Sequence, residues 1–125
     1  RQAAASLVID PAVVAVVGHY VAATTNAAES IYAQGGLPLL PMGTSPFSPV
    51  DPAGLPVEFQ EAYAAVTPFD EIAGPFAGPT FDAFGLLREA LAVAEESTGD
   101  ISRASVQEAL AGLKYQGLTG EVYQP

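Results

Sequence analysis

Hydroxyl side chains and a histidine follow the apolar segment 12–17, and residues of these types could bind a small polar group. His19 comes soon after this segment, and the segment 22–25, which includes Thr24 and Thr25, stands where the next helix is expected to begin. A helix N-terminus offers free backbone amides and the positive end of the helix dipole to a bound anion. Thr also caps ordinary helix starts, so a helix start without any ligand fits the same residues.

A second group of hydroxyls follows the apolar segment 37–40, in a loop that contains Gly43, Thr44 and Ser45. In an open α/β sheet, ligands bind just beyond the carboxyl ends of the strands. If the two apolar segments are adjacent parallel strands, both loops can converge on one small polar group. An ordinary Ser/Thr loop is the competing interpretation.

The sequence patterns for catalysis and for metal binding are weaker than the pattern for ligand binding at the strand ends. His19 is the only histidine, and an acidic residue with Ser30, Ser45 or Ser48 could complete a hydrolytic triad, but no G-x-S-x-G elbow selects a serine. A structural hydrogen bond is the alternative role for His19. The acidic pair 70–71 lacks the spacing of a calcium loop and is expected to be solvated. We predict no catalytic residue, no metal site and no cofactor.

Composition narrows the possible partners. The 125 residues contain 14 acidic and 4 basic side chains, which give a formal charge of -10 and would repel phosphate backbones and anionic lipid surfaces. Nucleic-acid binding and membrane insertion are therefore not expected. The chain contains no cysteine, which excludes disulfides and thiol chemistry.

The order of the expected elements predicts an α/β fold, a three-layer α/β/α unit with a small, mainly parallel sheet. A helix over 1–9, a strand over 12–17, a helix over 22–34 and the strand 37–40 form a strand-helix-strand unit within residues 1–46. A Pro-rich linker, 47–56, follows. The remaining residues, 57–125, are expected to form closing helices over 57–66, 80–96 and 103–113 and a hairpin-like tail, all within a single domain of residues 1–125.

Two parts of the chain resemble the leucine/isoleucine/valine-type solute-binding proteins of ABC transporters, which have the type I periplasmic binding protein fold. "VVAVVGHYVAATTNAAESIYAQGGLPLLPMGTSP" resembles the third strand, following helix and fourth strand of the first lobe. "AGPFAGPTFDAFGLLREALAVAE" and "SRASVQEALAGLKYQGLTGEVYQ" resemble the closing segment. The first strand-helix-strand of that lobe and nearly the whole second lobe have no counterpart, so the resemblance implies one incomplete lobe.

The resemblance also implies a ligand, a small amino acid or related carboxylate, held at the two strand ends. Backbone amides at Ala22, Ala23 and Thr24 would face its carboxylate, and Gly43 with the Thr44 hydroxyl would anchor its head group. The family commonly has a serine where this chain has Ala22. The implied role is non-enzymatic, with a transporter permease as partner and a periplasmic or extracellular location.

Two other functions stay open. The few strands leave exposed sheet edges, which proteins normally cover or pair, so we expect a homo-oligomer and keep a non-binding dimerisation or interaction module as an alternative. A small hydrolase using His19 is the second alternative. Arg1 begins a helix-like segment and the last residues are strand-like, so both ends are expected to be cut from a longer chain.

Overall fold

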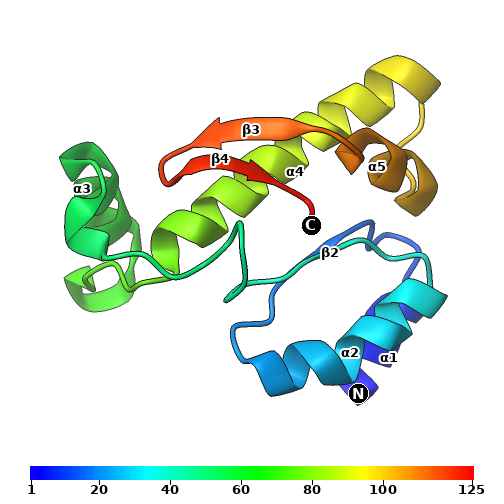
Figure 1. Ribbon diagram of the computed structural model, residues 1–125, viewed down its shortest axis with the longest axis horizontal. Coiled ribbons are helices and arrows are strands. Elements are labelled where there is room, and N and C mark those ends of the chain that lie inside the picture. Colours follow the sequence, from blue (N-terminus) through cyan, green and yellow to red (C-terminus); the bar gives the residue numbers. More distant parts are fainter.

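The computed structural model describes residues 1–125, apart from the side chain of Asp70. Five α-helices, two short 3-10 helices and four strands make up a mixed α/β fold, with the long helix α4 running through its length (Figure 1). In chain order the elements are α1 (Gln2–Ile9), β1 (Val16–Val17), α2 (Ala22–Gln34), β2 (Leu39–Leu40), η1 (Pro52–Gly54), α3 (Val57–Val66), η2 (Pro68–Asp70), α4 (Ala77–Thr98), α5 (Arg103–Leu110), β3 (Lys114–Gly117) and β4 (Gly120–Tyr123).

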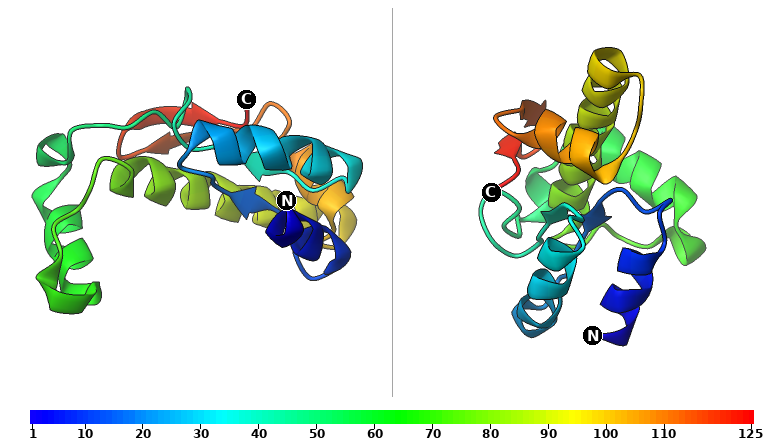
Figure 2. Two further views of the ribbon diagram at one scale, coloured as in Figure 1. Left: turned by 90° about the horizontal axis from the view of Figure 1, so that it is seen from below. Right: turned by 90° about the vertical axis from the view of Figure 1, so that its right-hand side faces the viewer.

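Strands β1 and β2 are parallel neighbours and have helices on both faces. Val16 is paired with Leu39 and Val17 with Leu40. Because side chains alternate across a strand, Val16 and Leu39 pack into the cluster formed with α1 and α2, whereas Val17 and Leu40 pack into the larger cluster around α4. Figure 2 shows α1 and α2 on the side of these strands that faces away from α4. The predicted strand-helix-strand order of residues 1–46 is present, and the crossover helix is α2.

The expected single, mainly parallel sheet is wrong, because the strands form two separate two-stranded sheets. The expected strand 12–17 shortens to Val16–Val17. Its partner β2 has Pro38 before it and Pro41 after it, and proline has no N–H to extend a ladder. Strands β3 and β4 pair antiparallel with each other, as the hairpin-like tail predicts, and rest on α4 instead of joining the first sheet (Figure 1).

The buried carboxylate of Asp82 fixes this hairpin to α4. Its Oδ1 accepts the amide of Leu118 at 2.8 Å, and its Oδ2 accepts the amide of Thr119 at 2.8 Å and the Thr119 hydroxyl at 2.6 Å. Asp82 is fully buried. A Cβ on Gly117 would collide with the carboxylate, so the close approach of the turn to α4 requires glycine there. A two-residue turn is thus held by three charge-assisted hydrogen bonds.

The guanidinium of Arg103 joins α5 to the N-terminal elements. Its Nε donates to the carbonyl of Val13 at 2.9 Å, and its Nη1 donates to Gly35 at 3.1 Å. Its Nη2 donates to Asp10 at 2.6 Å and to Leu7 at 3.2 Å. These carbonyls end α1 and α2 or precede β1, where helix ends leave acceptors without partners. One side chain therefore stabilises the ends of two helices and the start of a strand.

All the predicted helices are present, and the observed ends of α4 and α5 differ from the predicted ones by a few residues. α2 and α3 match the predicted residues. α4 begins three residues earlier than the predicted 80–96 and ends at Thr98, followed by the C-cap residue Gly99, whose φ of 68° suits glycine. α5 ends at Leu110 and not at 113, because the chain turns with the amide of Leu113 donating to the carbonyl of Leu110. Ser102 caps α5 in a capping box with Ser105.

None of the described helices combines the length and apolar character needed to cross a membrane.

Replacing Arg103 by methionine is expected to lower the free energy of unfolding by about 3 kcal/mol, because several carbonyls lose a charged donor while the apolar stem is kept. Urea unfolding followed by circular dichroism measures the change. Arg88→Met is the matched control, since Arg88 is an exposed arginine of α4 and its replacement should change stability by less than about 0.5 kcal/mol. Equal midpoints for the two variants would contradict the role of Arg103.

Replacing Asp82 by alanine is expected to cost about 3 kcal/mol, since three donors of the hairpin turn lose their acceptor. Amide hydrogen exchange should show Leu118 and Thr119 losing protection in this variant. Glu89→Ala, an acidic-to-alanine change at an exposed position of the same helix, should leave both protection and stability near those of the parent protein. Full protection of the turn in Asp82→Ala would disprove the assignment.

Candidate functional site

The loops that follow β1 and β2 lie next to each other. Each loop contains a glycine with positive φ, Gly18 at 143° and Gly43 at 92°, a conformation that other residues rarely adopt. A Cβ placed on Gly43 would lie 3.9 Å from the carbonyl oxygen of Tyr20. The structure therefore brings the carboxyl ends of two parallel strands together, which is the arrangement where α/β sheets bind ligands.

Of the predicted site residues, Ala22, Ala23 and Thr24 form the exposed first turn of α2. Val21 is the N-cap and offers no side-chain cap. The amides of Ala22 and Ala23 belong to the first turn, whose N–H groups have no partner within the helix. The Thr24 hydroxyl donates to the carbonyl of Val21 at 2.7 Å, so in this structure it supports the helix start.

Gly43 and Thr44 are the remaining predicted residues, and both are exposed. Gly43 lies against the Tyr20 loop, whereas Thr44 lines a cavity of about 430 Å³ beside β2, together with Glu29 and Pro41. The two loops therefore meet at Tyr20 and Gly43. Thr24 and Thr44 take part in no hydrogen bond with each other among the described residues.

His19 contacts an aromatic side chain. Its Nε2 lies 3.1 Å from the hydroxyl of Tyr32, and the two rings are nearly parallel with centroids 6.0 Å apart. Tyr32 is fully buried, and desolvation raises its pKa above the ordinary value of 10.0. No serine or carboxylate is hydrogen-bonded to the His19 ring in the described part of the chain. The structural hydrogen bond therefore accounts for His19, and a hydrolytic role stays a prediction.

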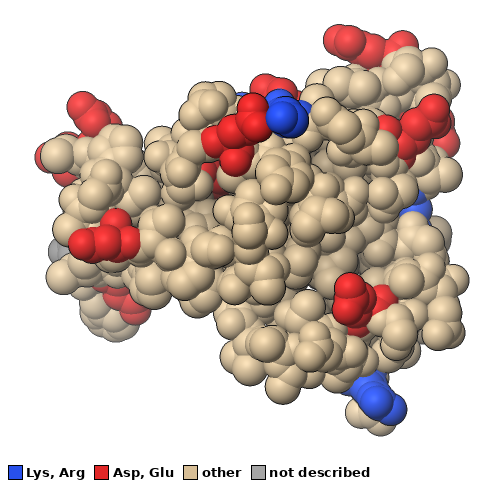
Figure 3. All heavy atoms as spheres, viewed as in Figure 1, with Lys and Arg blue, Asp and Glu red and all other residues tan. Residues whose placement is uncertain are grey.

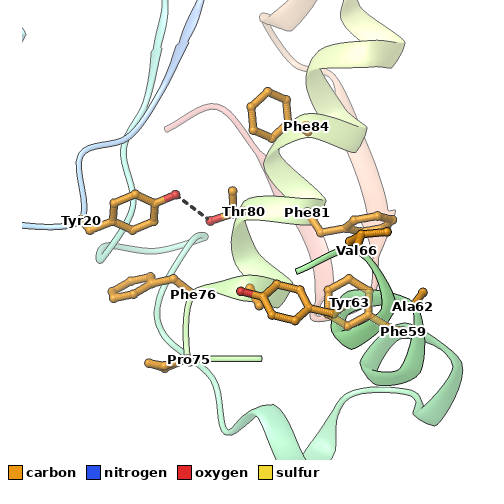
Figure 4. A pocket seen from close by; sticks show the side chains of 12 residues that line it. Tyr20, Phe59, Ala62, Tyr63, Val66, Pro75, Phe76, Thr80, Phe81 and Phe84 are labelled. Carbon is orange, nitrogen blue, oxygen red and sulfur yellow. Dashed lines mark hydrogen bonds between the residues drawn. The ribbon is translucent and has the colours of Figure 1, made fainter. Parts of the chain in front are cut away.

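A further concavity lies beside the strand ends and was not predicted from the sequence. It has a volume of about 680 Å³ and lies between α3, the first turns of α4 and Tyr20 (Figure 4). We call it the aromatic groove, after the six rings that line it: Tyr20, Phe59, Tyr63, Phe76, Phe81 and Phe84. A volume of this size is typical of small-molecule sites.

Phe84 shares the three-to-four-residue spacing of Leu87, Leu91 and Ala94 along α4, which is typical of a buried stripe, yet its side chain is exposed. Phe84 is 57% exposed and Phe81 51% exposed. Figure 2 shows α3 standing off the N-terminal end of α4, the part of the helix that carries these two residues. The signal that could have found the groove is the aromatic-rich segment "PFAGPTFDAF", in which three Phe residues fall within ten positions.

A short chain of polar contacts joins the groove to the strand-end loops. The hydroxyl of Tyr20 lies 3.4 Å from that of Thr80 on α4, and the Thr80 hydroxyl lies 3.7 Å from the sulfur of Met42 in the loop after β2. Figure 4 shows Tyr20 and Thr80 at the edge of the groove. The groove and the strand ends are therefore parts of one continuous surface.

Within the described side chains, no group of three or more acidic or histidine residues could hold a metal ion. The acidic pair 70–71 cannot be judged as a pair, because the Asp70 side chain lies outside the described residues. Comparison with protein-family models, with curated proteins and with solved structures found no match.

Proposed function

We propose that this chain is a solute-binding domain that holds a small amino acid or a related carboxylate at the ends of β1 and β2. The observation that carries the proposal is the contact between the two strand-end loops, where Gly43 lies against the carbonyl of Tyr20. The resemblance to one incomplete lobe of a type I periplasmic binding protein supports a ligand site at the same strand ends. A transporter permease as partner and a periplasmic or extracellular location belong to the proposal.

The chemistry of the loops suits an amino-acid head group. The amides of Ala22 and Ala23, at the positive end of α2, are donors for a carboxylate. The carbonyl oxygen of Tyr20 and the hydroxyl of Thr44 are acceptors for an ammonium group. Within residues 1–125 no second lobe covers the strand ends, so a ligand held there by these residues stays in contact with water and its polar contacts compete with solvent. We therefore expect affinity well below that of a two-lobed protein.

A second candidate function, self-association as an interaction module, is favoured by the exposed apolar side chains around η2. Val66 is 83% exposed, Phe69 98% and Ile72 89%. These three residues fall within seven positions of the chain, and groups of exposed apolar side chains commonly mark protein contacts. The two short sheets also leave strand edges unpaired.

Thermal unfolding with leucine, isoleucine or valine at millimolar concentration tests the first function. A ligand at about 100 times its Kd should raise the unfolding free energy by about 2.7 kcal/mol. Thr44→Val should lose much of this shift, because valine keeps the shape and removes the hydroxyl. Ser48→Ala, which removes another exposed hydroxyl nearby in the chain, should keep it.

The same experiment at several protein concentrations separates the two candidates. A shift that appears with ligand, and does not change with protein concentration, supports solute binding. Unfolding temperatures that rise with protein concentration, but do not change when any of the amino acids is added, would contradict solute binding and support self-association.

A further inference from the structure

The rings of the aromatic groove form two corners. Tyr20 and Phe76 meet edge to face, with centroids 5.3 Å apart and an interplanar angle of 67°. Phe59 and Phe81 do the same at 5.1 Å and 69°. Figure 4 places the first pair on one side of the groove and the second pair, with Tyr63, on the other. Two ring pairs set at steep angles on opposite sides of the groove make an open aromatic box.

The electrostatic surroundings of this box are negative. None of the lining residues within the described part of the chain is charged. α3 carries Glu58, one helical turn before the lining residue Ala62, and has no basic residue. Figure 3 shows acidic and no basic side chains over the α3 end of the visible face. The nearest cation along α4 is Arg88, one turn beyond Phe84, and the whole chain carries a formal charge of -10.

We propose that the aromatic groove binds a small organic cation that bears a methylated ammonium group. The negative faces of aromatic rings attract a cation, and they also provide apolar contact for the methyl groups, which an unmodified ammonium would not use. The acidic charge of α3 and of the whole chain attracts the same cation from solution. An anionic ligand would find no basic partner among the described lining residues. This site lies beside the strand-end loops and shares Tyr20 with them, and it does not depend on the function proposed for them.

Choline and its neutral carbon isostere, 3,3-dimethyl-1-butanol, form the direct test. The two molecules have nearly the same shape, and only choline is charged. Titration of the whole chain, followed by amide chemical shifts, should show choline binding in the groove about tenfold more tightly than the isostere. Equal affinities would overturn the proposal, because the groove would then be only an apolar surface. Absence of choline binding at any accessible concentration would overturn it as well.

Phe81→Leu and Phe84→Leu keep an apolar side chain and remove one ring face. Each should reduce the preference for choline over the isostere about threefold, with little change for the isostere. Phe69→Leu is the matched control, because Phe69 is 98% exposed and does not line the groove. Phe81 and Phe84 are half exposed, and an unchanged urea midpoint verifies that each variant is folded. An unchanged preference in both folded variants would contradict the box.

Glu58→Gln isolates the contribution of charge. Choline should bind more weakly to this variant, and the isostere should bind as before; added salt should act in the same direction. An equal loss for both molecules would overturn the electrostatic part. None of these probes carries a carboxylate, so their failure leaves the strand-end site untouched, and failure of leucine, isoleucine and valine leaves this proposal untouched.

Discussion

The donation of the Arg103 guanidinium to backbone carbonyls is the interaction on which the arrangement of this chain most depends. It reaches acceptors at the end of α1, before β1 and at the end of α2, 68 to 96 positions away in sequence. β1 and β2 are only two residues long, so their ladder alone holds them weakly. Packing on both faces and this one cation therefore determine where the strand ends lie, and so where the candidate site forms.

Asp82 likewise joins distant parts of the chain, because it binds the turn between β3 and β4 to α4. A buried carboxylate is tolerated because the backbone of the hairpin turn and one hydroxyl satisfy it. On either side of Asp82, the N-terminal part of α4 carries Phe81 and Phe84, which are half exposed, and Phe81 meets Phe59 of α3. The same helix thus builds the core with one face and the aromatic groove with its first turns.

The helices and the strand pairs could be predicted from sequence, but the division of the strands into two sheets could not. The predicted ranges of α2 and α3 and the predicted start of α5 match the structure, because the signals for helices are local. The division into two sheets depends on Asp82 meeting a turn 36 residues away, which no local pattern shows. The strand-end loops follow from the strand-helix-strand order. The groove does not, because a helical repeat cannot tell a ring that faces the core from one that faces an opening.

The most direct test of the account is to map which backbone amides respond to leucine in solution. If the strand ends form the binding site, the largest chemical-shift changes fall at Ala22, Ala23 and Gly43, and the hairpin turn at Leu118 stays unchanged. Changes confined to the aromatic groove, or no changes at saturating leucine, would contradict the claim that the two loops bind an amino acid.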